Sequence, residues 1–223
     1  MKDDVLLLDV RKSNLLLHTN YLIFKRSFDI IFSLLGLILL LPVIILVKIA
    51  YMLTGDFHRI IFTQSRIGKN GKEFKFFKFR SMVVNADEVL KELLKNDKKL
   101  AKEYKINKKL KDDPRITKVG KFIRKTSIDE LPQLINILKG DMSFVGNRPY
   151  LPREKKDMGK YFDDIVSTRP GLTGYWQVSG RSDTTFEYRL KCERWYSLNR
   201  TLSLDTKIFF KTFTTVIGRK GAK

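Results

Sequence analysis

A long apolar segment near the start of the sequence constrains the fold more than any other feature. No charged residue occurs from Ile30 to Val47, and after a single lysine the apolar run continues over residues 49–53. At about 1.5 Å per residue, a helix of this length is long enough to cross the hydrocarbon core of a bilayer. The run begins too late for a secretory signal peptide, and no small-residue cleavage site follows it. We therefore predict a membrane element over residues 21–54 that stays in the mature protein.

Pro42 lies in the middle of this segment. A proline removes one helical hydrogen bond and clashes with the carbonyl four residues earlier, so we expect a break or bend over residues 38–42. Lys25 and Arg26 precede the run and further basic residues follow it. The positive-inside rule would keep both basic ends in the cytoplasm if the segment entered and returned as a hairpin. Proline also occurs in ordinary spanning helices, so the residues favour the hairpin only slightly over a straight span.

Length and charge bound the rest of the chain. The 223 residues suffice for one domain with a core plus a membrane element, and residues 1–20 predict a short amphipathic or poorly ordered arm. Lys and Arg number 44 against 24 Asp and Glu, a net charge of +20, and residues 55–125 alone carry 21 basic and 9 acidic residues. This excess indicates a polyanionic partner, either nucleic acid, anionic lipid or a phosphorylated substrate. Because the basic region follows the apolar segment, attraction to an anionic leaflet is the simplest interpretation.

Several kinds of site have no support in the sequence. Cys192 is the only cysteine, so no intrachain disulfide forms, and His18 and His58 are too isolated to suggest a zinc site. Gly68-x-x-Gly71 lacks the Lys-Ser/Thr end of a P-loop, and no Gly-x-Gly-x-x-Gly motif follows an expected strand. The sequence therefore favours neither an ATPase nor a dinucleotide-binding fold.

Two stretches beyond the membrane element have the spacing of amphipathic helices. Over residues 86–104, leucines recur at helical spacing with lysines on the other faces, which predicts one surface helix. Residues 204–217 repeat this spacing with larger apolar residues. The second helix either packs against the core or lies in the membrane interface.

Asp129 and Glu130 form an acidic pair beside the basic residues of 121–125. Ser127-x-x-Glu130 matches a capping box for the helix that follows, which gives Glu130 a purely structural explanation. Asp129 is a competing N-cap, because it would place Pro132 in the first turn, where a missing N–H costs little. In both cases the carboxylates lie near a helix N-terminus, whose dipole favours anions.

The same acidic pair suits phosphoryl chemistry. An aspartate can attack phosphorus to form a covalent intermediate, and an adjacent carboxylate can hold Mg²⁺. Magnesium fits such a pair because it binds a few carboxylates together with phosphate and water oxygens. Asp129 and Glu130 are therefore candidates for a nucleophile and a metal ligand.

A second basic stretch alternates with aromatic residues. Lys78-Phe79-Arg80-Ser81-Met82 ends a β-like alternation of phenylalanines and comes after Gln64-x-Arg66-x-Gly68. Such residues bind nucleic acid through phosphate contacts and stacking, or bind a diphosphate, and by themselves they do not separate the two. Residues 140–149 and 169–181 are rich in glycine and proline, which also suits ordinary ordered loops.

Together these motifs resemble the bacterial sugar transferases known as monotopic phosphoglycosyl transferases, over about Lys25 to Thr212. The resemblance implies an α/β, mainly helical fold. It comprises a re-entrant helix-break-helix, then a compact catalytic domain over residues 55–223 with amphipathic interfacial helices, on the cytoplasmic face of the inner (plasma) membrane. The family's usual break is Ser-Pro, whereas this chain has Leu41-Pro42, so any role of that serine is absent.

The resemblance also assigns roles to residues in the basic and acidic motifs. Asp129 matches the nucleophile, Glu130 the Mg²⁺ contact and Arg124 an arginine that binds phosphate. Lys78 or Arg80 would bind the diphosphate.

Further family positions lie in the later blocks. Arg148 and Pro149 belong to a block that usually ends Gly-Pro-Arg-Pro and contributes to the nucleotide pocket. Asn147 replaces the first of these prolines, which puts the rigidity of the loop in doubt. Glu193 aligns where the family often has an aspartate, and we assign it no chemical role.

The reaction implied is transfer of a sugar-1-phosphate from a UDP-sugar to undecaprenyl phosphate through a covalent aspartyl-phosphosugar, with release of UMP. It would be the first membrane step in building an exopolysaccharide, capsule or other glycoconjugate. Residues 145–154 look nearest to members that transfer galactose phosphate, so galactose is expected ahead of glucose and N-acetylated sugars. The expected partners are the UDP-sugar, undecaprenyl phosphate and a membrane with anionic lipids, without nucleic acid, and a homo-oligomer stays open.

Two other functions compete with this one. A non-catalytic, membrane-tethered basic protein that binds nucleic acid or anionic lipid would explain the charge and the apolar segment, but not the acidic pair. A glycosyltransferase that moves the sugar without its phosphate would release UDP instead of UMP.

Overall fold

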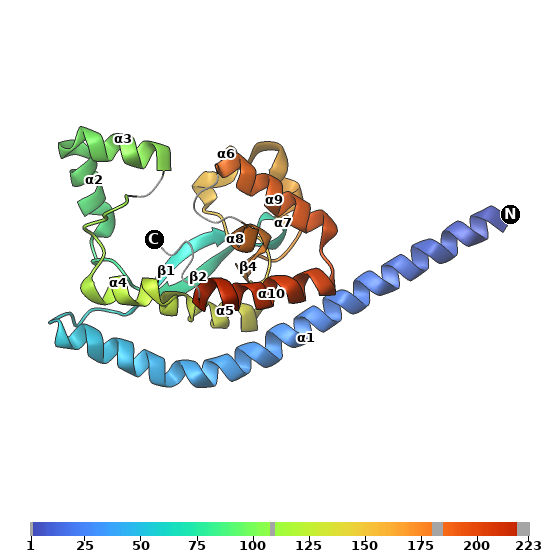
Figure 1. Ribbon diagram of the computed structural model, residues 1–223, viewed down its shortest axis with the longest axis horizontal. Helices are drawn as coiled ribbons and strands as arrows, with labels where there is room; N and C mark the ends of the chain where they lie inside the picture. Colours follow the sequence, from blue (N-terminus) through green and yellow to red (C-terminus); the bar gives the residue numbers. More distant parts are fainter. Residues whose placement is uncertain (1, 108–109, 180–184, 218–223) are drawn as a thin grey trace.

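In the computed structural model, the described residues are 2–107, 110–179 and 185–217. The α-helices are α1 (Lys2–Leu53), α2 (Ala86–Asn96), α3 (Lys98–Asn107), α4 (Lys118–Lys125), α5 (Gln133–Lys139), α6 (Lys155–Met158), α7 (Phe162–Val166), α8 (Tyr175–Ser179), α9 (Phe186–Asn199) and α10 (Leu202–Ile217). The strands are β1 (Ile61–Ile67), β2 (Glu73–Phe79), β3 (Ser143–Val145) and β4 (Gly171–Thr173). A long N-terminal helix thus lies along one side of a mixed, mainly helical domain (Figure 1), which confirms the predicted fold class at this level.

The long helix α1 contains the whole predicted membrane element, and the expected boundary at residue 20 falls inside it. The chain stays helical through Pro42, so of the predicted break or bend there is no break, and α1 curves in its C-terminal half (Figure 1). A bend without a break is expected where proline withholds one donor while the neighbouring hydrogen bonds persist. Within the described chain, one helix, His18–Leu53, is long and apolar enough to cross a membrane.

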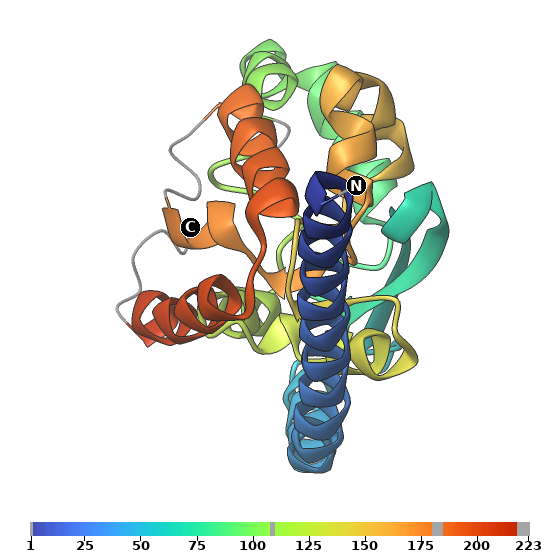
Figure 2. The same cartoon turned by 90° about the vertical axis from the view of Figure 1, so that its right-hand side faces the viewer.

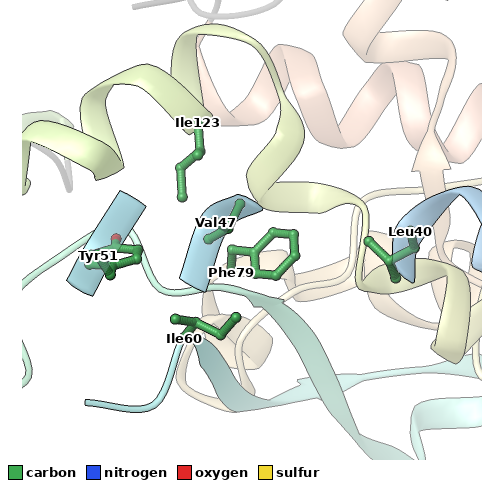
Figure 3. Close-up of a cluster of buried hydrophobic side chains, with 6 residues drawn as sticks. All are labelled: Leu40, Val47, Tyr51, Ile60, Phe79 and Ile123. Atoms are coloured by element: carbon green, nitrogen blue, oxygen red, sulfur yellow. The ribbon is translucent and has the colours of Figure 1, made fainter. Parts of the chain in front are cut away.

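The C-terminal half of α1 is part of the core of the domain. Its buried side chains pack against a strand, the turn before β1 and α4 (Figure 3), in a cluster made of Leu40, Val47, Tyr51, Ile60, Phe79 and Ile123. Tyr51 is fully buried, and its hydroxyl donates a hydrogen bond to the backbone carbonyl of Arg80. Truncating one large side chain in such a cluster typically costs about 3–5 kcal/mol. The helix is therefore an integral element of the fold, and the cluster would not close without it.

α1 also approaches α5 closely. At Gly36 an added Cβ would lie 2.8 Å from Cδ1 of Leu134, so a larger side chain would have to displace the side chain of Leu134. Small residues at such crossings let helix backbones come close together. This crossing holds α1 beneath the segment that contains the acidic pair.

The two longer strands form an antiparallel hairpin. Ile61 pairs with Phe79 and Ile67 with Glu73, and the connection passes through the 3₁₀ turn Lys69–Gly71. Asn70 and Gly71 both have positive φ, at 58° and 75°. Asparagine and glycine tolerate this left-handed conformation, which suits a tight hairpin connection.

The two short strands form a separate parallel pair. Ser143 lies opposite Gly171 and Val145 opposite Thr173. Gly171 is required by this approach, because a Cβ on it would come within 2.1 Å of the amide nitrogen of Gly146. The 140–149 and 169–181 blocks of the sequence are thereby joined, although Gly180 and Arg181 at the end of the second block lie outside the described residues.

The single surface helix predicted over residues 86–104 is wrong, because the structure has two helices there, α2 and α3. The break is at Asp97, whose Oδ1 accepts hydrogen bonds from the amide nitrogens of Lys99 and Leu100, at 2.8 and 3.0 Å. This is N-capping of a new helix, which an aspartate favours over continuing the old one. Figures 1 and 2 place this lysine-rich pair on the side of the domain opposite the middle of α1, so its proximity to the apolar segment in sequence is not kept in space.

The predicted C-terminal helix corresponds to α10. Ile208 is 2 % exposed and packs with Val145 and Tyr196, whereas Phe210 on the other side is 63 % exposed. Phe209 makes edge-to-face contacts with Phe28 of α1 at 5.4 Å and with Phe144 of β3 at 6.1 Å between ring centroids. α10 therefore packs on the core through one face and leaves an apolar edge beside α1.

Candidate active site

The acidic pair lies in a single 3₁₀ turn, Ile128–Glu130, that directly follows α4. Ser127 has a left-handed conformation with φ 57° and its amide nitrogen donates to the carbonyl of Arg124, which ends α4. The Ser127 side chain makes no capping hydrogen bond, and α5 begins only at Gln133. The predicted capping box is therefore absent, because Ser127 terminates the preceding helix and does not start the next one. The sharp reversal brings α4 and the acidic pair together.

α4 is held in place by a close backbone contact. A Cβ on Gly120 would lie 1.9 Å from the carbonyl oxygen of Ser81, so only glycine allows this approach. One turn later, Nε of Arg124 donates to Oγ of Ser81 at 2.8 Å. The Ser81 segment thus fixes both the position of α4 and the direction of the Arg124 side chain.

The β-hairpin collects the predicted basic residues on one face. Its register places Phe62 opposite Lys78 and Gln64 opposite Phe76, and alternate residues of each strand share a face. Gln64, Arg66 and Lys78 therefore lie on the same side of the hairpin. Arg66 is stabilised there by a hydrogen bond to Oε1 of Gln64 at 2.8 Å and by the ring of Phe76, 5.3 Å from its guanidinium carbon.

The acidic pair and this basic face influence each other electrostatically. Asp129 is 8 % exposed, and its burial raises the pKa of its carboxyl, while the charges of Lys78 and Arg124 act in the opposite direction. Burial likewise lowers the pKa of Lys78, an effect increased by Arg124 and opposed by Asp129. Glu130 is exposed next to the buried Asp129. The site therefore combines a desolvated carboxylate with two cations close enough to favour its ionised form.

A side-chain amide joins the acidic segment to the hairpin. Asn136 is fully buried in α5, and its Oδ1 accepts a hydrogen bond from the amide nitrogen of Phe77 at 3.0 Å. Its Nδ2 donates to the carbonyl of Lys75 at 2.7 Å. The amide thus bonds to the edge of β2 as a neighbouring strand would, immediately before Lys78.

The loop with Arg148 and Pro149 adjoins the other end of the same hairpin face. The guanidinium of Arg66 donates to the carbonyl of Pro149 at 3.0 Å. Asn147 is buried, and its amide nitrogen lies within hydrogen-bond reach of Ile165 O, Thr168 Oγ1 and Ser197 Oγ. These contacts hold the loop against α7 and α9. Asn147 thereby fixes by hydrogen bonds a segment whose rigidity the sequence had left in doubt.

Glu193 of α9 contributes to the same loop. It is 2 % exposed, and its Oε1 accepts a hydrogen bond from the amide nitrogen of Arg148 at 3.3 Å. Burial raises the pKa of the Glu193 carboxyl to about 7, against the lowering effects of Tyr150, Arg189 and Arg148. The residue therefore supports the loop and changes charge near neutral pH.

We expect Glu193→Gln to remove a pH dependence of stability. The ordinary pKa is 4.5 and the folded value about 7, so between these values the folded protein binds the proton more tightly than the unfolded chain. The free energy of unfolding should therefore fall as pH rises through this window, by about 3 kcal/mol in total. Denaturant unfolding at pH 5 and pH 8 should show the stabilising effect of Glu193→Gln growing with pH.

Glu187→Gln is the matched control for this experiment. Glu187 lies on the same helix but is exposed, in an ion pair with Lys191 at 2.9 Å. Its substitution should change stability little at both pH values. An effect of Glu193→Gln that is the same at pH 5 and pH 8 would contradict the assignment.

Arg80 is placed differently from Lys78. It is buried, and its guanidinium donates to Arg59 O at 2.8 Å, Met82 O at 3.2 Å and Asp56 Oδ1 at 2.9 Å. It also lies over the ring of Tyr51, 4.5 Å from the centroid. These donors are engaged at the junction between α1 and β1.

The carboxylates present define what metal the site could hold. In the part of the chain that the structure describes, no group of three or more His, Cys, Asp or Glu side chains is gathered as a metal site. Near the acidic pair, the donors are one exposed and one buried carboxylate, Glu130 and Asp129. Mg²⁺ is commonly bound by one or two carboxylates together with substrate phosphates and waters. The donor set fits a magnesium ion that arrives with a diphosphate, and it does not fit a metal bound by protein alone.

The supporting roles of three residues were not predicted from the sequence. Ser81, Asn136 and Glu193 are all buried polar side chains whose partners are distant in sequence. Asn136 carried the clearest signal, since it lies between the core residues Leu134 and Ile137 on a short apolar helix. A buried polar residue of this kind needs a hydrogen-bond partner.

Comparison with known proteins identifies the family of this sequence. The sequence matches the bacterial sugar transferase family over residues 20–219. It is 49 % identical over 201 residues to the undecaprenyl-phosphate galactose phosphotransferase of Salmonella typhimurium, covering 89 % of this chain and 41 % of that protein. Over 198 residues it is 42 % identical to the exopolysaccharide production protein ExoY of Sinorhizobium fredii, covering 89 % of this chain and 87 % of the relative.

A relative named for a different sugar is more distant. The UDP-glucose:undecaprenyl-phosphate glucose-1-phosphate transferase of Escherichia coli is 36 % identical over 196 residues, covering 84 % of this chain and 39 % of that protein. The chain therefore spans less than half the length of the galactose- and glucose-named relatives and most of the length of the ExoY protein. Since the match extends over nearly the whole sequence, the chain belongs to the bacterial sugar transferase family.

Proposed function

We propose that this protein transfers a sugar-1-phosphate from a UDP-sugar to undecaprenyl phosphate and releases UMP. The observation that carries the proposal is the buried Asp129 beside the cations of Lys78 and Arg124. A nucleophilic carboxylate for a diphosphate must be ionised and must approach a negatively charged phosphorus. Nearby cations serve both needs, because they favour the ionised carboxylate and offset the charge of the phosphates. Membership of the bacterial sugar transferase family supports the same reaction.

In the proposed first step, a carboxylate oxygen of Asp129 attacks the phosphorus that bears the sugar. The bond from that phosphorus to the oxygen bridging to the α-phosphate breaks, and UMP leaves with the bonding electron pair. In the second step, a phosphate oxygen of undecaprenyl phosphate attacks the same phosphorus and restores the Asp129 carboxylate. The product is undecaprenyl diphosphate sugar. This is double displacement through a covalent enzyme intermediate.

We assign the remaining residues by their position around Asp129. Lys78 and Arg124 hold the phosphate undergoing transfer, and Ser81 directs Arg124. Glu130, exposed beside the nucleophile, would hold Mg²⁺, which when bound neutralises charge on the diphosphate oxygens. Of the two basic candidates on β2, Lys78 is proposed to contact substrate and Arg80 to support the fold, because the donors of Arg80 are engaged within the protein.

The nucleotide is proposed to extend along the hairpin face toward Arg148. Arg66 lies between Lys78 and the loop of Pro149. Besides the effect of burial, the positive charge of Arg148 lowers the pKa of Arg66, and the charge of Arg66 lowers the pKa of Lys78. Burial, with Arg148 nearby, lowers the pKa of Arg66 to about 10, so it remains charged at neutral pH. A continuous cationic path of this kind suits a diphosphate with a nucleoside at one end.

We also propose that α1 enters the membrane and returns without crossing it. Lys25, close to the middle of α1, donates to Val145 O of β3, and Tyr51 near the end of the helix is in the core of the same domain. At about 1.5 Å per residue these residues are about 39 Å apart along the helix, which exceeds the hydrocarbon thickness. A straight spanning helix would place them on opposite sides of the bilayer, whereas one domain contacts both. The domain over residues 55–223 would then lie on the cytoplasmic face, where UDP-sugars are made available.

The outward surface of α1 supports membrane contact. Its exposed side chains are predominantly large and apolar, and they include Ile31, Leu35, Ile38, Leu39, Leu41, Ile45, Leu46, Ile49 and Leu53. An apolar patch of this extent on a soluble domain would be a liability for aggregation. α4 adds the exposed Phe122 between Lys121 and Lys125, a pairing suited to an interface with anionic lipid.

Galactose is the proposed sugar. The relative named for galactose phosphate transfer is 49 % identical to this chain, compared with 36 % for the relative named for glucose phosphate transfer. The two sugars differ only in the configuration of one hydroxyl, so this assignment depends on the comparison and not on the geometry. A panel of UDP-sugars would test it directly.

The identity of the released nucleotide tests the reaction. Purified protein in nanodiscs should be supplied with undecaprenyl phosphate, Mg²⁺ and UDP-galactose carrying ³²P in the β-phosphate. UMP in solution and ³²P in the lipid fraction are the expected result. UDP as product would indicate transfer of the sugar alone, and no release from any UDP-sugar, with salt-sensitive binding to nucleic acid or anionic vesicles, would favour a binding protein.

Lys78→Met should change the pH dependence of the reaction. Removing this cation removes a charge that lowers the pKa of Asp129, so the nucleophile should ionise only at higher pH. The acid limb of the kcat/KM profile should move up by about one pH unit, in addition to any loss of substrate binding. Lys75→Met is the control, because Lys75 is exposed on the other face of the same strand. An acid limb that does not move would show that Lys78 does not act on Asp129.

A further inference from the structure

Three charged residues, Lys25, Arg26 and Asp29, precede the apolar run of α1, and each of them contacts the rest of the domain. Asp29 is 1 % exposed, and the charged groups of Lys25 and Arg26 contact backbone carbonyls of the catalytic domain. Their positive charges also fit the positive-inside rule, but the contacts indicate a second purpose. These three residues are referred to below as the α1 polar triplet.

Two members of the triplet bind the edge of β3 that β4 does not cover. Oδ1 of Asp29 accepts hydrogen bonds from the amide nitrogen of Phe144 at 2.9 Å and from Oγ of Ser143 at 3.0 Å. Nζ of Lys25 donates to the carbonyl of Val145 at 2.8 Å. One helical turn advances about 5.4 Å, and two residues of a strand advance about 6.6 Å. Two side chains four residues apart on a helix can therefore reach backbone groups that are one to two residues apart on a neighbouring strand. Side chains of α1 thus take the place of a third strand.

The third member binds the end of α5. The two terminal nitrogens of Arg26 donate to the carbonyls of Ile137 at 2.7 Å and Leu138 at 2.8 Å. These carbonyls lie in the last turn of the helix, where a cation is favoured, and the carbonyl of Ile137 also accepts a hydrogen bond from the amide nitrogen of Gly140. α5 begins three residues after Glu130. The triplet therefore contacts the segments on both sides of the site, one beside the acidic pair and one leading to Arg148.

An aromatic contact reinforces the attachment to β3. Phe28, within the triplet's turn of helix, lies edge-to-face against Phe144 at 5.8 Å and against Phe209 at 5.4 Å between ring centroids. Such contacts add to the apolar burial on either side of the polar bonds. β3 is thereby fixed on α1 immediately before the chain enters the loop of residues 146–149.

We propose that Asp29 is a positioning residue for the nucleotide-binding loop. Lys25 adds a hydrogen bond to the same strand and is itself held by an ion pair with Asp205 of α10. Asp29 acts on substrate through β3, which leads directly to Arg148, and does not touch substrate itself. The proposal rests on the proposed function, since it assigns to Asp29 an effect on binding of the UDP-sugar. A consequence is that the conformation of the nucleotide-binding loop depends on how α1 packs against β3.

Asp29→Leu and Asp29→Asn distinguish positioning from mere packing. Asparagine retains an oxygen that accepts from Phe144 N–H, whereas leucine fills similar volume without an acceptor. We expect Asp29→Leu to raise the KM for the UDP-sugar about tenfold with little change in kcat, since a hydrogen bond to a charged group is lost. Asp29→Asn should stay within about twofold of the parent protein. Ser33→Ala is the control, because Ser33 is buried one turn away and its hydroxyl donates to Ile30 O of its own helix.

Hydrogen exchange provides a readout that does not depend on turnover. Asp29→Leu should increase amide exchange over residues 143–149 and leave residues 190–199 of α9 unchanged. If this variant does not fold, Asp29→Ser replaces it, because a serine is too short to reach the strand. A folded variant with parental KM and parental exchange would overturn the proposal, as would equal effects of leucine and asparagine. Absence of UMP release from the parent protein, with exchange changed as expected, would refute the reaction and leave the positioning contact intact.

Discussion

Replacing Asp129 by asparagine should lower the rate of UMP release by about 10⁴-fold or more, because the substitution removes the nucleophile while keeping its size. The positive charges of Lys78 and Arg124 favour the ionised form of the buried Asp129 carboxyl, and the asparagine has no charge for them to stabilise. The measurement is single-turnover release of UMP from UDP-galactose in nanodiscs, both with and without undecaprenyl phosphate. Without acceptor, the parent protein should release up to one equivalent of UMP and retain ³²P, whereas the variant should do neither.

Asp112→Asn serves as the control for Asp129→Asn. Asp112 also belongs to an acidic pair, with Asp113, but it is exposed and lies before α4. Its substitution should leave the rate within about twofold, as is usual for exposed sites away from the chemistry. An Asp129→Asn protein that still retains ³²P stoichiometrically would exclude Asp129 as the attacking group, and the same experiment on Glu130→Gln would then identify whether its neighbour attacks.

Replacing Asn136 by alanine should produce the largest loss of stability among the substitutions considered. Its amide satisfies the amide nitrogen of Phe77 and the carbonyl of Lys75, and alanine leaves both without that partner as well as an empty volume. The free energy of unfolding should fall by about 2–4 kcal/mol. Activity of the folded fraction should fall too, because the bonded strand edge precedes Lys78. Thermal unfolding together with kcat/KM, normalised to folded protein, provides the measurement.

Asn199→Ala is the control for the loss of an asparagine amide. Asn199 lies at the end of α9, is exposed, and donates only to the carbonyl of Trp195 four residues earlier, at 2.8 Å. Its replacement should change stability by about 0.5 kcal/mol or less. A similar small effect for Asn136→Ala would mean that the amide does not hold β2 in place.

The regular elements of this fold could largely be predicted from local patterns. Each of three such elements has a hydrophobic pattern of its own that predicts it. The patterns are the apolar run of α1, the alternating phenylalanines of β2 and the helical spacing of apolar residues in α10. Local patterns failed where two local preferences competed. At Ser127 the capping box was outweighed by a left-handed residue that ends α4, and at Asp97 a cap divided one amphipathic stretch into two helices.

The site itself was predictable in its acidic pair but not in its support. Asp129, Glu130 and Arg124 lie within seven residues, so their proximity follows from the chain. Lys78 reaches them only through the packing of the hairpin, and Arg80, two residues on, points to the junction with α1. Whether Lys78 or Arg80 lies near the acidic pair depends on strand register and burial. Neither can be predicted from the spacing of the basic residues alone.

If α1 enters the membrane as proposed, its packing against the domain would also determine the height of the proposed active site relative to the bilayer. Ile128 and Leu131, on either side of Asp129, pack against the same cluster as Leu40 and Val47 of the helix. An enzyme tethered by a flexible linker samples many distances from the bilayer, and its active site meets a lipid phosphate in only some of them. In the proposed arrangement, the depth of α1 in the lipid would set the distance of the Asp129 carboxylate from the bilayer, because the helix and the acidic segment pack in the same cluster. A change in the depth of α1 in the bilayer should therefore change the distance between Asp129 and the phosphate groups of the lipid headgroups.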